Sequence, residues 1–200
     1  MRKNLLKRTM ALALSTFLSV TFVNAQTTWK VDRSHSVVKF VVTHNVVSEV
    51  EGTFKVFDGT IKTAKEDFTD AQIDFTISVE SINTNNEGRD RHLKADDMFD
   101  VAKFPNATFK STSFKHLGGN KYELKGNLTI KDVTKPVTWE VTYGGSIQGA
   151  RGKKAGFKAK TTIDRFDYNI KWNRVIEAGG LVVGKEVEVE VKLELDEVKQ

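Results

Sequence analysis

Four histidines and no cysteines are the side chains from which this 200-residue chain would have to build a metal site. His35 and His44 lie nine residues apart, and an odd separation places them on opposite faces of one continuous strand, so they cannot share an ion. His92 lies in a polar segment and His116 near a hairpin turn. No His-x-His or His-Glu-x-x-His pair is present, so the sequence predicts no metal site.

Ser36 follows His35, and these two residue types serve as nucleophile and base in many hydrolases. Adjacent strand residues point to opposite faces, however, and no nucleophile-elbow motif surrounds the serine. The sequence therefore predicts no catalytic residues here, and we do not expect an enzyme.

Two polar groups remain as candidates for ligand binding. Asp90 and His92 alternate with two arginines in one short stretch, and Arg165 and Asp167 form the second group. One interpretation is structural: Asp90 lies near the positive end of a helix and makes an ion pair with Arg165. The other is functional: the four side chains bind the polar or phosphorylated head of a ligand. The sequence leaves both open.

The first polar group lies in a segment that interrupts an otherwise strand-rich chain. Residues 71–80 alternate with a period of two, which is typical of a half-buried strand. From 81 to 105 the chain is polar and aperiodic, and the pair Asn85-Asn86 offers a helix cap. We predict a short helical excursion at about 85–100 that covers part of a sheet structure.

Most of the remaining chain after the N-terminal 25 residues consists of strands with one apolar and one charged face. The last strand is the most regular, because valines and leucines from 187 to 195 alternate with charged residues. About eight antiparallel strands fit a sandwich or a closed barrel, and closure removes exposed strand edges. We therefore predict an all-β fold: an eight-stranded antiparallel barrel with the helical excursion near one mouth.

Several local features carry expectations of their own. Residues 49–62 are expected to form one strand, in which Gly52 and Gly59 mark a bulge or a sharp coil. Ser113 is expected on the same strand face as Phe109. The glycines between 144 and 152 are expected to form a loose connection.

The apolar strand face points inward in such a barrel, and the interior can hold one small ligand. Several inward positions carry small side chains, which leaves more room than an all-leucine face. A barrel core filled by its own side chains is the alternative. The residues expected to line a ligand cavity are Phe40, Phe54, Ile73, Phe75, Ile77, Phe109, Leu128, Trp139, Val141, Phe157, Ile163, Val189 and Val191.

The N-terminus has the pattern of a secretory signal peptide. A basic start, MRKNLLKR, precedes a mostly apolar run from Met10 to Val23, and small residues end the segment at Ala25. We expect residues 1–25 to be cleaved and 26–200 to form a single domain. The leader holds four of the 31 Lys+Arg and no acid, so 27 basic residues face 26 acidic ones afterwards. This balance gives no electrostatic reason to expect nucleic acid, and no other apolar run is long enough to span a membrane.

A series of short motifs extends along almost the whole chain from Trp29 to Leu195. The motifs are Trp29-x-Val31-Asp32-x-x-His35-Ser36, Gly52-Thr53-Phe54, Gly59-x-Ile61, Ser81-Ile82-Asn83-Thr84, Arg89-Asp90-x-His92-Leu93, Phe99-Asp100, Phe104-Pro105, Gly126-x-Leu128-Thr129-Ile130, Thr134-Lys135-Pro136-Val137 and Ile163-Asp164-Arg165-x-Asp167. In their order and spacing they resemble the motifs of the YceI-like family. Two positions depart from that pattern, because Asp132-Val133 and Asn169 stand where the family often has glycine.

The resemblance implies a lipocalin-like barrel whose apolar bore takes a polyisoprenoid chain, in secreted or periplasmic bacterial proteins. The expected function is to hold a long isoprenoid lipid, such as an isoprenoid quinone, for transport, storage or sequestration, without a further cofactor. Family members often pair, which makes a homodimer an expected option. Two alternatives stay open: an enzyme that acts on a lipid head group through Asp90, His92 and Arg165, and a stress-response structural barrel without a ligand.

Overall fold

The structure, a computed structural model, describes residues 26–150, 152–175 and 179–198. The predicted signal peptide lies outside the described residues. Within them the chain forms eleven strand segments and one α-helix, α1 (Glu87–Lys94), together with three short 3₁₀ turns at Arg33–His35, Val79–Ser81 and Arg165–Tyr168. The strands are β1 (Thr27–Val31), β2 (Val37–His44), β3 (Ser48–Phe54), β4 (Phe57–Thr63), β5 (Gln72–Ser78), β6 (Ile82–Asn83), β7 (Asn106–Gly118), β8 (Lys121–Ile130), β9 (Val133–Gly149), β10 (Gly152–Asp164) and β11 (Val183–Val198).

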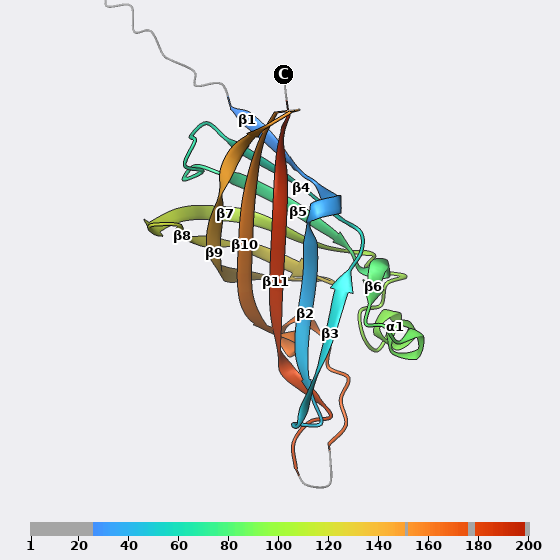
Figure 1. The fold of residues 1–200 in the computed structure, drawn as a ribbon. Helices are drawn as coiled ribbons and strands as arrows, with labels where there is room; N and C mark the ends of the chain where they lie inside the picture. The colour runs from blue at the N-terminus through green and yellow to red at the C-terminus, as the bar shows by residue number, and fades with distance from the viewer. Residues whose placement is uncertain (1–25, 151, 176–178, 199–200) are drawn as a thin grey trace, which may run out of the picture.

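All of these segments belong to one antiparallel sheet that closes on itself, because β1 pairs with both β4 and β11. β1 and β2 are the halves of one long strand interrupted by a 3₁₀ turn, and β5 and β6 are divided in the same way. β3 and β4 are also halves of one strand, separated by two residues without a 3₁₀ turn. The described segments therefore make eight strands in up-and-down order, the first beside the last (Figure 1). The predicted eight-stranded antiparallel barrel is confirmed.

Residues 49–62 were predicted to form one strand. They form β3 and β4 instead, with a break at Lys55 and Val56. The register is regular on both sides, so Gly52 and Gly59 mark no bulge. Their role is to make room: a Cβ atom at Gly52 would overlap the ring of Phe40, and one at Gly59 would overlap the ring of Phe75.

Two further local predictions were wrong. The register of β7 shifts between Ser111 and Ser113, so Ser113 is exposed and Phe114 turns inward in its place. The glycines between 144 and 152 do not form a loose loop, since β9 continues to Gly149 and β10 begins at Gly152. The register of this pair shifts beside Gly156 instead.

Of the residues that depart from the family pattern, Asn169 has left-handed backbone itself, whereas at Asp132-Val133 the left-handed residue is the preceding Lys131. The β8–β9 hairpin is tight, with Ile130 opposite Val133 and a φ of 55° at Lys131. Asn169 has a φ of 60° and ends the 3₁₀ turn that begins at Arg165. Asparagine tolerates this conformation better than most residues, which explains how it replaces glycine here.

The helical excursion lies at one end of the barrel, beside β6 (Figure 1), as predicted. The side chain of Asn86 caps α1 by accepting a hydrogen bond from the Arg89 backbone N–H at 2.9 Å. Turns follow α1 and bury Met98, and Pro105 ends the excursion directly before β7. At the other end of the barrel, Phe68 of the β4–β5 loop is buried against Trp29, with ring centroids 5.3 Å apart.

No helix among the described residues is both long enough and apolar enough to cross a membrane.

Candidate ligand-binding cavity

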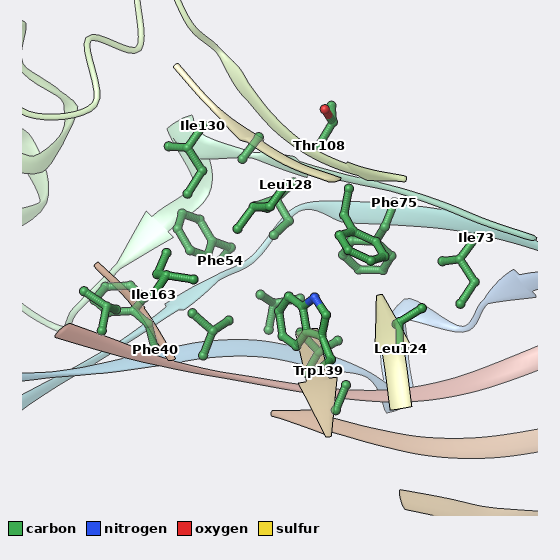
Figure 2. Close-up of a pocket in the computed structure, with 18 of the residues that line it drawn as sticks. Phe40, Phe54, Ile73, Phe75, Thr108, Leu124, Leu128, Ile130, Trp139 and Ile163 are labelled. Carbon is green, nitrogen blue, oxygen red and sulfur yellow. The ribbon is translucent and has the colours of Figure 1, made fainter. Parts of the chain in front are cut away.

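A cavity of about 220 Å³ lies inside the barrel, between the excursion at one end and Phe68 at the other. Every long strand of the barrel contributes to its wall, and Figure 2 shows aromatic and aliphatic side chains converging on this space. The inward positions are apolar because the strands alternate. In β8, the even-numbered positions 122–130 are buried, whereas the odd-numbered positions between them are exposed or half-buried.

All thirteen side chains predicted to line a ligand cavity lie in this wall: Phe40, Phe54, Ile73, Phe75, Ile77, Phe109, Leu128, Trp139, Val141, Phe157, Ile163, Val189 and Val191. That they contact a ligand stays a prediction. Leu93, Met98 and Phe99 also line the cavity, from the excursion, and were not predicted. Their signal was available, because they are apolar residues within an otherwise polar stretch.

The cavity is small for a long lipid. Pockets for drug-sized ligands have volumes of about 300–1,000 Å³, so 220 Å³ accepts a long chain only if wall side chains change rotamer or part of the chain leaves through an opening. Three aromatic rings meet near the excursion: Phe54 packs edge-on against Phe99, with ring centroids 6.4 Å apart, and in a tilted arrangement against Phe40, with ring centroids 5.7 Å apart.

Arg165 is 5 % exposed and lines the cavity at the end near the excursion. Its guanidinium donates to four backbone carbonyls: Nε to Gly184 at 2.9 Å, Nη1 to Ile170 at 2.7 Å and Trp172 at 2.8 Å, and Nη2 to Val183 at 2.9 Å. No carboxylate of the described chain lies within 4.0 Å of it, and burial lowers the pKa of Arg165 from its usual value. Arg165 thus holds the chain before β11 against the barrel, and the ion pair with Asp90 is absent.

The other polar residues predicted at the mouth also have protein partners. Asp90 Oδ1 accepts hydrogen bonds from the backbone N–H of Thr84 at 2.8 Å and from its hydroxyl at 2.6 Å. His92 Nε2 lies 3.0 Å from Asp97 Oδ2, and Asp167 is 3.8 Å from the Lys135 ammonium. The structure therefore brings Asp90 and His92 together on one excursion but gives each a separate internal partner.

One cluster was not predicted. Asp32, His35 and Glu194 offer three potential metal-ligand atoms within 4.8 Å of one another, although Glu194 is far away in sequence. Asp32 accepts hydrogen bonds from Ser34 and His35, which lowers its pKa, and its proximity raises the pKa of His35. The Lys154 ammonium lies 2.7 Å from Glu194 and already supplies a positive charge to the cluster. The expectation that no metal binds stays a prediction.

Comparisons with known proteins agree on one family. The YceI-like domain family matches residues 29–195. Protein YceI of Salmonella newport (strain SL254) is 41% identical over 173 residues, which cover 85% of this chain and 88% of that protein.

Two solved structures have the same fold. Burkholderia cenocepacia BcnA is 27% identical with a TM-score of 0.72, over 82% of this chain and 98% of that one. A Saccharophagus degradans domain, described as a polyisoprenoid binding domain implicated in plant cell wall breakdown, has a TM-score of 0.63 over 85% of this chain and 98% of its own. Its 16% identity limits that likeness to the fold.

Proposed function

Because this chain belongs to the YceI-like family, we propose that it is a binding protein that holds a long isoprenoid-type lipid inside its barrel. The observation that carries the proposal is the cavity, whose wall is almost wholly apolar and draws on every long strand. A hydrocarbon chain gains about 0.8 kcal/mol for each buried CH₂ group, so this wall favours length and apolarity in a ligand.

The protein acts as a carrier, store or scavenger of that lipid in the periplasm or outside the cell. This location rests on the signal-peptide pattern of the first 25 residues. A protein that encloses the chain offers a route through water for a lipid that is otherwise confined to membranes. The polyisoprenoid binding named for the S. degradans domain is compatible with this role, but the proposal stands on the cavity because that likeness is limited to the fold.

We further propose that the protein is not an enzyme. Asp90, His92 and Arg165, the candidates for head-group chemistry, are bonded to Thr84, Asp97 and backbone carbonyls respectively. A general acid or base needs a free path to its substrate within about 2.6–3.2 Å. These bonds favour a structural role for the three side chains.

Native mass spectrometry of the protein purified from the periplasm of an expressing bacterium tests the function. We expect a discrete added mass that extracts into organic solvent as a polyprenyl compound. Bare protein that also fails to take up polyprenyl lipid supplied in excess would contradict the proposal. A filled-core barrel without a ligand would then be the better account.

A further inference from the structure

Trp139 places an unpaired hydrogen-bond donor in the cavity wall. The residue is 7 % exposed, and no acceptor among the described residues lies within hydrogen-bond distance of its Nε1 atom. Figure 2 shows this nitrogen at the edge of the indole ring that faces the middle of the pocket. Buried donors in folded proteins almost always have an acceptor, so an orphan N–H in a binding cavity indicates a missing partner.

The other polar side chains around the cavity differ from Trp139. Arg165 directs its donors at four backbone carbonyls. Tyr168 lies at the same end as Arg165, and burial raises its pKa to about 12, so its phenol stays neutral. Thr108 is half-buried, and its oxygen points away from the pocket in Figure 2. Among these side chains, Trp139 is the one that places a buried donor without an acceptor among the described residues in the middle of the wall.

We propose that the Trp139 indole N–H donates a hydrogen bond to an uncharged acceptor oxygen of the bound lipid, which enters the barrel with that oxygen inside. This inference rests on the proposed function and adds to it the class of polar group that the ligand carries. An indole N–H is only a donor, so its partner is an acceptor such as a ketone, ether or hydroxyl oxygen.

The surroundings of Trp139 exclude a charged head at this position. Phe75, Phe109, Leu124 and Leu128 line the same cavity and offer no counter-charge. A phosphate or carboxylate transferred into such surroundings loses its hydration without a compensating partner, which costs far more than one neutral hydrogen bond returns.

The Phe109 ring packs against the Trp139 ring. The two rings meet edge to face, with centroids 6.0 Å apart and an interplanar angle of 80°. An N–H···π contact is a second-order interaction, and an oxygen acceptor is stronger. The Phe109 ring therefore leaves the donor free to prefer a ligand oxygen.

Trp139→Phe removes the donor while it keeps an aromatic ring. The test uses the full chain stripped of bound lipid and two probes of matched length, geranylgeranyl acetone and its parent hydrocarbon, with affinities from equilibrium dialysis. We expect Trp139→Phe to weaken binding of the ketone roughly two- to tenfold more than binding of the hydrocarbon, as the loss of one neutral hydrogen bond predicts.

Trp29→Phe is the matched control. Trp29 is 5 % exposed and its Nε1 atom also lacks an acceptor among the described residues, but Trp29 does not line the cavity. The Trp29 variant should bind both probes as the parent protein does. Equal weakening of both probes by Trp139→Phe would overturn the inference, because it would assign Trp139 a packing role alone. Failure of the parent protein to bind either probe would instead overturn the proposed function.

Discussion

The cavity wall and the polar excursion at its mouth differ in whether their polar side chains have hydrogen-bond partners within the protein. In the excursion, Asp90 is bonded to Thr84 and His92 to Asp97. In the wall, apolar side chains surround unfilled space, and the Trp139 N–H has no acceptor among the described residues. The sequence left a structural and a functional interpretation of the mouth residues open, and the region with unused binding capacity is the apolar wall.

The first prediction reduces the cavity and should have the largest effect. Ala159 lines the cavity from β10, so Ala159→Phe places a ring in a space of only about 220 Å³. We expect the affinity for an isoprenoid lipid to fall more than tenfold, measured by equilibrium dialysis. Thr162→Phe, at an exposed position of the same strand, is the control and should bind normally. Normal binding by Ala159→Phe would show that the ligand lies elsewhere.

The second prediction separates stability from binding at Arg165. Arg165→Met leaves four backbone carbonyls without their donor, and buried unpaired polar groups are costly. We expect the free energy of unfolding to fall by about 3 kcal/mol in a urea titration. Arg91→Met, at an exposed arginine of α1, should change it by less than about 0.5 kcal/mol. An equal loss of unfolding free energy in the Arg165→Met and Arg91→Met variants would contradict the structural role of Arg165.

A smaller effect is expected at Asp90. If this residue is structural, its loss lowers stability, whereas if it binds the ligand, its loss lowers lipid affinity. Asp90→Ala removes two hydrogen bonds to Thr84 and should lower the free energy of unfolding by about 1 kcal/mol. Lipid affinity should stay within about twofold of the parent value, which is below the effect of one typical hydrogen bond. If affinity falls sharply while stability is unchanged, the mouth binds the ligand's head and the comparison fails.

The smallest effect concerns the charged outer face. Burial alone would raise the pKa of Glu190, but hydrogen bonds from Lys192, Lys158 and Lys160, at 3.0, 3.1 and 3.2 Å, lower it to about 2. This stabilisation is present above the ordinary value of 4.5 and is lost as the pH falls towards 2. Glu190→Gln should flatten the pH dependence of the free energy of unfolding in that interval, by less than about 1 kcal/mol, without changing lipid affinity. An unchanged pH profile would contradict this assignment.

Strand alternation predicted the antiparallel strands and most of the thirteen wall residues, because the inward face of a strand follows from its period of two. The choice of a barrel over a sandwich rested on closure of the strand edges and on the family resemblance. Alternation failed at Ser113, since one extra residue in a bulge exchanges the two faces and leaves no clear mark in the sequence. Strand alternation also could not predict the hydrogen-bond partners of the polar residues. Arg165 reaches carbonyls up to 19 residues away, and Glu194 meets Asp32 only because the barrel closes.

The crystal structure of the protein loaded with an isoprenoid lipid tests the central claim most directly. We expect the chain to lie inside the barrel against Phe75 and Phe109, with the bonds between Asp90 and Thr84 unchanged. A chain bound on the outer surface, or held at Asp90 and His92 while the barrel interior is filled by its own side chains, would contradict the account.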